Sequence, residues 1–361
     1  MSEGLEGVIA ARTILSHVDG QRGRLILRGR RLEDLAGQTD LEGIAALLWY
    51  GLGAGDPNPQ TLRARFGRQR QSAFARLPGL LARVGPLQPM EALRFMVASL
   101  PDGDPCDDAP AQERVTAAIP VFLAGILRHA TGEAPVAPDP ALNQAADFLA
   151  MLGGKAASAA EIAALETYLV TVADHGLNAS TFAARVIAST QAGTISAVTG
   201  ALCALKGPLH GGAPGPVLDM FDAITESGDT KAWLEAAIDG GERLMGFGHR
   251  VYRVRDPRAD VLKQVVVSLK DGDNRIAFAE AVEATALAVL AAKKPGRRLD
   301  TNVEFYTALA LQALGIPRAA FTALFAMGRV VGWCAHIMEQ ERTGRLIRPS
   351  ADYVGPEVSA A

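Results

Sequence analysis

Apolar side chains recur along this chain at the three- and four-residue spacing of amphipathic helices, and the pattern predicts helix after helix. Two helix starts carry a capping-box spacing, in which a serine or threonine precedes a glutamate by three positions: Thr39 to Glu42 and Ser158 to Glu161. The uncharged segment 186–205 contains hydroxyl and amide side chains and a central glycine, which favours two buried helices over a membrane span. The last long helix is expected from about Arg318 to Arg342.

A β signal occurs near the N-terminus, over residues 13–27. Two short apolar runs there flank Asp19 and Gly20, a pair typical of a hairpin turn. Strand signals are nearly absent from the rest of the chain, and neither an internal repeat nor a long linker interrupts it. The fold class is therefore predicted to be all-α, with a minor N-terminal β-hairpin.

Composition and charge narrow the function classes. The chain has 361 residues, enough for one large domain or two, and its 49% hydrophobic and 21% charged residues are ordinary for a globular protein with a full core. A net charge of −3 gives no reason to expect nucleic-acid or membrane binding. The first residues are acidic and lack the apolar core of a signal peptide, so we expect a cytoplasmic protein.

The cysteines and histidines predict neither disulfides nor a metal site. Cys106, Cys203 and Cys334 are odd in number, far apart and without CxxC spacing. We expect Cys203 and Cys334 to be buried thiols, because both lie in apolar helical patterns. The six histidines lack metal-ligand spacing, and the chain has no GxxxxGK(S/T), strand-linked GxGxxG or GxSxG motif for a nucleotide or a serine nucleophile.

The stretch from Met245 to Arg258 combines groups that transfer protons with groups that bind anions. Gly246 and Gly248 allow a tight turn, and Asp256 followed by proline marks a helix start. The segment also holds one histidine and four arginines: His249, Arg250, Arg253, Arg255 and Arg258. A histidine exchanges a proton near neutral pH, and arginines bind carboxylates or phosphates in a forked geometry. The alternative is a solvated basic loop with an incidental histidine.

Two further stretches extend this picture. Lys-Gly-Pro-Leu-His-Gly-Gly-Ala-Pro carries His210, and Thr-Asn-Val-Glu-Phe-Tyr carries Glu304. Together with the Met245–Arg258 stretch, they resemble the signature motifs of the citrate synthase family, in the same order. The intervals also agree with the family, because 39 residues separate His210 from His249 and 55 separate His249 from Glu304. The resemblance extends from Gly7 to about Gly355.

The resemblance implies a fold and an activity. It implies a large, dimer-forming helical domain of residues 1–215 and 319–361, with a small helical domain of residues 216–318 that closes over the active site. It implies condensation of acetyl-CoA with oxaloacetate, followed by hydrolysis of citryl-CoA to citrate and CoA. No cofactor is implied, since acetyl-CoA is a substrate, and the assembly is expected to be a homodimer.

The resemblance also assigns roles to individual residues. Glu304 matches the base that takes a proton from the thioester methyl, His210 the group that stabilises the enol oxygen, and His249 the acid that polarises the oxaloacetate ketone. The residues that match oxaloacetate ligands are His175, His249, Arg258, Arg329 and Arg348, the last reaching into the partner's site. The residues that match the CoA site are Arg253, Leu209, Gly212, Ala213, Gly246, Phe247, Gly248 and Asn302.

The base is where this sequence departs from the family. The family usually has Asn-Val-Asp-Phe, whereas this chain has Glu304, whose extra methylene lengthens the side chain by roughly 1.5 Å. Two other functions therefore stay open beside citrate synthase. One is 2-methylcitrate synthase acting on propionyl-CoA, since one methylene in a pocket is worth only about 1–3 kcal/mol of discrimination. The other is a non-catalytic subunit that serves in binding or assembly.

Overall fold

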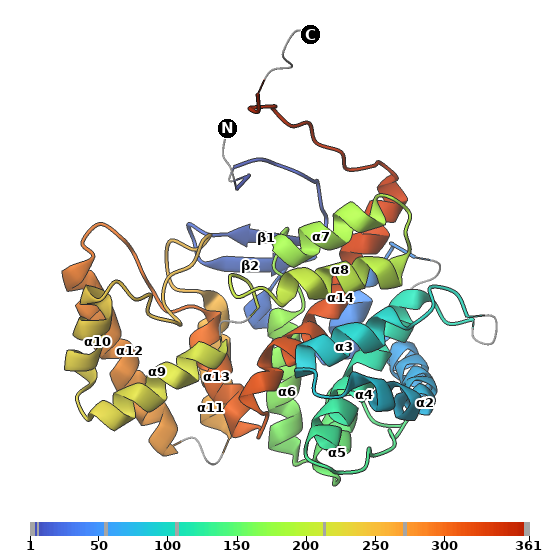
Figure 1. The fold of residues 1–361 in the computed structure, drawn as a ribbon, viewed down its shortest axis with the longest axis horizontal. Coiled ribbons are helices and arrows are strands. Elements are labelled where there is room, and N and C mark those ends of the chain that lie inside the picture. The colour runs from blue at the N-terminus through green and yellow to red at the C-terminus, as the bar shows by residue number, and fades with distance from the viewer. Residues whose placement is uncertain are drawn as a thin grey trace.

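The computed structural model describes residues 4–5, 7–53, 57–104, 108–211, 214–269 and 273–356. These residues form mainly helices, which confirms the predicted fold class (Figure 1). The elements are β1 (Ser16–Asp19), β2 (Arg24–Leu27), β3 (Arg30–Arg31), η1 (Leu32–Asp34), α1 (Leu41–Trp49), α2 (Pro59–Val84), α3 (Pro89–Ala98), α4 (Ala111–Ala130), α5 (Gln144–Gly153), α6 (Ala159–Val172), α7 (Ala179–Ala188), α8 (Thr194–Leu205), α9 (Pro214–Ser227), α10 (Thr230–Asp239), α11 (Pro257–Ser268), α12 (Asp273–Lys293), α13 (Val303–Ala313), η3 (Arg318–Ala320) and α14 (Phe321–Thr343).

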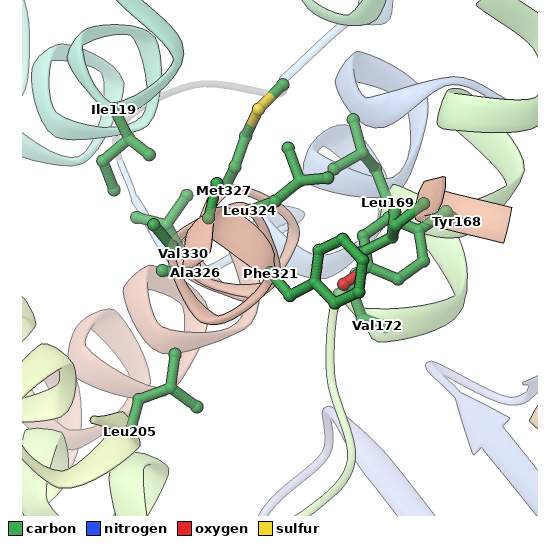
Figure 2. Packing of buried hydrophobic residues seen from close by; sticks show 14 of the residues in the cluster. Ile119, Tyr168, Leu169, Val172, Leu205, Phe321, Leu324, Ala326, Met327 and Val330 are labelled. Carbon is green, nitrogen blue, oxygen red and sulfur yellow. The ribbon is translucent and has the colours of Figure 1, made fainter. Parts of the chain in front are cut away.

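Helix α14 is the central element of the fold, and α1, α4, α6, α7 and α8 pack around it. Figure 2 shows its apolar side chains meeting those of α4, α6 and α8; the labelled residues are Ile119, Tyr168, Leu169, Val172, Leu205, Phe321, Leu324, Ala326, Met327 and Val330. The glycine at position 332 lets α14 approach the end of α6 closely, because a Cβ there would lie 2.2 Å from the carbonyl oxygen of Ala173. This contact fixes the point at which the chain leaves α6 toward His175.

The segment Arg318–Arg342 is long and apolar enough to cross a membrane by length and composition alone. However, 83% of its most apolar window is buried inside the protein. Its hydrophobicity is therefore explained by its place at the centre of the helical core, where α14 is surrounded by other helices.

The N-terminal hairpin forms as predicted. Strands β1 and β2 pair antiparallel from Ser16 opposite Leu27 to Asp19 opposite Arg24, and the short β3 adds a third strand. Leu25 and Leu27 point into the core and are fully buried. The sheet lies close to α7 and to the loop before α11 (Figure 1), so a small strand element abuts the region where the candidate site residues gather.

One of the two predicted capping boxes is confirmed and the other is wrong. Ser158 and Glu161 satisfy each other's backbone N–H groups at the start of α6. At α1 the cap is Asp40 rather than the preceding threonine, since its Oδ1 accepts the N–H of Gly43 at 2.8 Å. Glu42 instead accepts the N–H of Gln144 at 2.9 Å and is fully buried. The carboxylate of Glu42 thus binds a free N–H group at the start of α5 and does not bind the backbone at the start of its own helix, α1.

Cys334 is buried as expected, but the expectation for Cys203 is wrong, because Cys203 is exposed. The buried face of α8 runs through Ile195, Val198 and Leu202, and Cys203 falls on the opposite side of the helix. An apolar helix therefore does not hide every apolar side chain that it carries.

Helices α9 to α13 gather on one side of the molecule, and the N-terminal helices with α14 form the other side (Figure 1). Helix α11 connects the two groups by packing against both α6 and α13. The loops before α9, α11 and α13 carry His210, His249 and Asn302 respectively. The residues that the sequence singled out thus come from several segments, and the packing of α11 and α14 determines how they meet.

Candidate active site

The loop that carries His249 is held against the start of α13. Gly246 and Gly248 have φ values of +85° and +78°, which favour glycine. The Gly246 carbonyl accepts the N–H of Asn302 at 2.9 Å, and the Gly248 N–H donates to the carbonyl of Asp300 at 2.8 Å. The two motifs, more than fifty residues apart in sequence, are therefore joined by backbone hydrogen bonds.

Helix α13 presents Glu304 in its first turn. Asn302 caps the helix by accepting the N–H of Glu304 at 3.1 Å, and its Nδ2 donates to the Gly248 carbonyl at 2.8 Å. Within the described part of the chain, Glu304 Oε2 is buried and has no hydrogen-bond partner. Burial raises the pKa of Glu304, although the nearby Arg258 opposes the shift. A desolvated carboxylate with free lone pairs has the properties of a general base.

The ring of His249 has a defined tautomer. Its Nδ1 accepts the backbone N–H groups of Val251 and Tyr252, both at 3.0 Å. Burial, together with Arg258, lowers the pKa of His249 to about 4, so the ring is neutral at pH 7 and carries its proton on Nε2. That nitrogen lies 3.4 Å from Nη2 of Arg258. Two donors this close together can both donate to a single acceptor that lies to one side of them.

Arg258 is oriented by its neighbour Asp256. The carboxylate accepts from Nη2 of Arg258 at 2.7 Å and from its Nε at 3.0 Å, and both residues are buried. Asp256 also accepts the N–H of Arg258 and so caps α11, as the sequence predicted. The aspartate therefore holds the guanidinium rigid beside His249, a form of preorganisation that binding sites for carboxylates require.

His175 joins the same cluster. Its ring centroid lies 5.5 Å from that of His249, and its Nε2 lies 3.1 Å from the hydroxyl of Tyr252. Burial first, and the charge of Arg258 second, lower the pKa of His175 well below the usual value. Sequence reasoning assigned no role to Tyr252, although it lies inside the Met245–Arg258 stretch. Its ring also packs 4.7 Å from that of His249, and the side chain is buried.

His210 is held by Ser180, the second site residue that sequence reasoning missed. His210 Nε2 lies 2.8 Å from the Ser180 hydroxyl and receives the Ser180 backbone N–H at 3.3 Å. Trp333 donates to the same hydroxyl at 3.1 Å. Burial, with a smaller effect of Arg329, lowers the pKa of His210 to about 4. The neutral ring therefore carries its proton on Nδ1, which it offers as a donor.

Arg329 is a buried cation that forms no ion pair among the described residues. Its Nε donates to the carbonyl of Val172 at 2.5 Å, and its guanidinium stacks 4.7 Å from the ring centre of Phe325. Burial lowers the pKa of Arg329 to about 10, and the charge of Asp174 opposes this shift. A buried guanidinium without an anion is costly, so this position points to a ligand that supplies one.

The structure brings His175, His210, His249, Arg258, Glu304 and Arg329 into one region, linked by the contacts and mutual charge effects given above. Phe247 and Asn302 lie beneath it and are buried. Arg253 and Leu209 are exposed at its edge. Arg348 lies in the exposed segment after α14, which extends away from the helices (Figure 1), so it does not join the other residues within this chain. Gly212 and Ala213 lie outside the described residues.

The arrangement combines a desolvated carboxylate, neutral histidine donors and two buried guanidinium groups. It fits a ligand that bears carboxylates and a carbonyl group, next to a base able to take a proton from carbon. Among the residues that the structure describes, no group of three or more His, Cys, Asp and Glu side chains is placed to hold a metal ion.

Comparisons with known proteins agree with this geometry. The family model described as "Citrate synthase, C-terminal domain" matches residues 4–350. The citrate synthase of Haloferax volcanii is 38% identical over 371 residues, covering 98% of this chain and 96% of that protein. The 2-methylcitrate synthase of Mycobacterium tuberculosis is 36% identical over 376 residues, covering 99% of this chain and 91% of that protein.

A solved structure of a citrate synthase has the same fold as this chain. It is the ternary complex of carboxymethyl coenzyme A and oxaloacetate with citrate synthase from Thermoplasma acidophilum. It superposes with a TM-score of 0.87 at 31% identity, covering 100% of this chain and 98% of that chain. The chain therefore belongs to the citrate synthase family and is a citrate synthase-type transferase.

Proposed function

We propose that this enzyme condenses acetyl-CoA with oxaloacetate and hydrolyses citryl-CoA, releasing citrate and CoA. The observation that carries the proposal is the pair of groups formed by His249 Nε2 and Arg258 Nη2, 3.4 Å apart, together with Glu304, whose buried Oε2 has no hydrogen-bond partner among the described residues. An α-keto dicarboxylate offers carbonyl and carboxylate oxygens that can accept hydrogen bonds from these two groups. A thioester methyl supplies a proton for the carboxylate.

The first step is enolisation of the thioester. Glu304 takes a proton from the methyl carbon, and the electron pair of that C–H bond moves toward the thioester carbonyl. The Nδ1–H of His210 donates a hydrogen bond to the developing enol oxygen. A neutral imidazole suits this role, because it stabilises the partial charge without protonating the oxygen outright. The Ser180 contacts support the tautomer that the role requires.

The second step forms the carbon–carbon bond. The enol carbon attacks the ketone carbon of oxaloacetate, and His249 gives its Nε2 proton to the ketone oxygen as that oxygen becomes an alcohol. The proton that Glu304 took from the methyl carbon then passes to His249, which restores the neutral imidazole and the Glu304 carboxylate. Arg258 and Arg329 bind the carboxylates, and His175 donates a further hydrogen bond to the same substrate. Water then attacks the citryl thioester carbonyl, and the C–S bond breaks to release CoA as a thiol. No cofactor takes part in these steps.

The remaining assignments concern CoA and the partner subunit. We assign Arg253, which is exposed, to a phosphate of CoA. The other residues that we assign to CoA binding are Leu209, Gly246, Phe247, Gly248 and Asn302, together with Gly212 and Ala213, which lie outside the described residues. The enzyme is a homodimer in which Arg348 completes the partner's site. The exposed, extended segment that carries Arg348 supports this arrangement, since it reaches beyond the helices of its own chain.

Residues 216–318 act as a small domain that closes over residues 1–215 and 319–361 when oxaloacetate binds. The site is divided between the two parts, with His175, His210 and Arg329 on one and His249, Arg258 and Glu304 on the other, so closure would complete it and exclude water. We place the enzyme in the cytoplasm. Free Cys203 and Cys334 support a reducing compartment.

Release of CoA from acetyl-CoA, followed with a thiol reagent, tests the proposal. We expect release that depends on oxaloacetate and produces citrate. A larger kcat/KM with propionyl-CoA would instead make the enzyme a 2-methylcitrate synthase, which the similarity to the Mycobacterium tuberculosis protein makes the relevant comparison. Oxaloacetate binding in calorimetry without CoA release from either thioester would identify a non-catalytic binding or assembly subunit.

A further inference from the structure

Strand β1 touches the loop that carries His175. The hydroxyl of Ser16, the first residue of the strand, donates to Oδ2 of Asp174 and accepts the backbone N–H of Gly176 at 3.0 Å. These two contacts lie on either side of His175 in sequence. Asp174 is fully buried, so a single serine hydroxyl ties the loop to the strand through a group that has no access to water.

The far end of β1 touches the loop that carries His249. The carbonyl of Gly20 accepts the N–H of Arg253 at 2.8 Å. A Cβ on Gly20 would lie 2.2 Å from the carbonyl oxygen of Val251, a distance that no side chain allows. Gly20 does not have a left-handed φ. Glycine is therefore needed here for close approach to the loop and not for the backbone conformation.

The two anchor points are parts of one rigid element. Strand β1 pairs with β2 at every position from Ser16 to Asp19, so Ser16 and Gly20 are held about 13 Å apart by a paired strand. Between these anchors the two loops meet directly, through the bond from Tyr252 to His175. The hairpin thus contacts both loops. It belongs to the N-terminal part of the chain, whereas the His249 loop lies within residues 216–318.

We propose that the β1–β2 hairpin is a positioning element of the active site, in which Ser16 and Gly20 hold the His175 and His249 loops so that both rings reach one oxaloacetate molecule. The proposal deepens the proposed function and depends on it for the identity of the ligand. Its physical basis is that a shift of about 1 Å in a catalytic group costs about 10²-fold in rate. Neither anchor touches the substrate.

The test compares Gly20→Ala with Gly153→Ala. Gly153 ends α5, also lacks a left-handed φ, and a Cβ there meets nothing within 4 Å, so it is a matched control. We expect Gly20→Ala to raise the KM for oxaloacetate by about tenfold or more and to leave the KM for acetyl-CoA within about twofold of wild type. Hydrogen exchange of the Arg253 amide should accelerate in Gly20→Ala alone.

A Gly20→Ala enzyme with wild-type KM for oxaloacetate and unchanged exchange at Arg253 would overturn the proposal. If this variant does not fold, Ser16→Ala provides the same test at the other anchor: a raised KM for oxaloacetate supports the proposal, and an unchanged KM refutes it. Calorimetric titration with oxaloacetate separates the two proposals. A wild type that binds oxaloacetate but releases no CoA refutes the proposed function, and a weaker Kd in Gly20→Ala would still support the positioning role.

Discussion

The hydroxyl of Tyr252 lies 3.1 Å from Nε2 of His175, and this bond joins the loop that carries His175 to the loop that carries His249. Tyr252→Phe keeps the ring that packs on His249 but removes the hydroxyl. A hydrogen bond of this kind is worth about 0.5–1.5 kcal/mol, so we expect the KM for oxaloacetate to rise roughly two- to tenfold. Steady-state kinetics check this, with the exposed Tyr50→Phe as the control. Equal KM values in both variants would show that the hydroxyl has no positioning role.

We expect Arg329 to lower the stability of the folded protein and to be needed for oxaloacetate binding. Arg329→Met replaces a buried cation, which forms no ion pair within the described part of the chain, with an apolar side chain of similar length. We expect the variant to be at least as stable as wild type in urea, because replacing buried ionic groups with apolar ones is often neutral or stabilising. Its KM for oxaloacetate should rise by roughly 30-fold or more. A large loss of stability without a change in KM would make Arg329 a structural residue.

The protonation of His249 links folding to pH. Burial lowers the pKa of His249 from 6.5 to about 4, so between these values the unfolded chain binds a proton that the folded protein excludes. The contribution of His249 to the free energy of unfolding is therefore fully present above about pH 6.5, and it is lost as the pH falls toward 4.

Replacing His249 with glutamine removes this one titration. Between pH 7 and pH 5 the wild type should lose more unfolding free energy than His249→Gln, by up to about 1.4 kcal/mol per pH unit within the window. Urea titrations at both pH values measure the difference, and the ionisable groups that do not contact His249 cancel in the comparison. Equal losses in the two proteins would show that His249 is not kept neutral by the fold.

Arg348 should act in the neighbouring subunit. Arg348→Ala and Arg258→Ala are each expected to be nearly inactive. In a mixture, half of the dimers carry one chain of each kind, and each of these has one intact site, so about a quarter of the wild-type activity should return. Activity of mixed and unmixed variants, refolded together and apart, checks this. Mixtures that stay inactive would contradict a shared site.

The helical fold and much of the site followed from the sequence, because both depend on local patterns. Helix α13 begins at the asparagine cap that the motif contains, and Asp256 caps α11 as expected. Glu304 and His249 were assigned through the family's motifs, and the structure shows how backbone bonds from Gly246 and Gly248 bring those motifs together.

The contacts between distant segments could not be predicted in this way. Ser180 contacts His210, 30 residues away in sequence, and Tyr252 contacts His175, 77 residues away. Neither contact is marked in the sequence by a hydrophobic period or a capping motif. The same reason explains the wrong expectation for Glu42, whose local spacing suited a capping box but whose carboxylate is taken by a helix about 100 residues later. The packing of helices against one another, such as α7 on α8 and α1 on α5, brings these partners together.

The most direct test of the account concerns Glu304 as the base. Thiol release from acetyl-CoA with oxaloacetate should fall by about 10³-fold in Glu304→Gln, because general acid–base catalysis typically contributes 10²–10⁴-fold. Calorimetry should show that the variant still binds oxaloacetate with the affinity of wild type, since the carboxylate is assigned to the thioester. A Glu304→Gln enzyme that retains more than about a tenth of the wild-type rate would show that Glu304 is not the base, because loss of a general base lowers the rate by far more than tenfold.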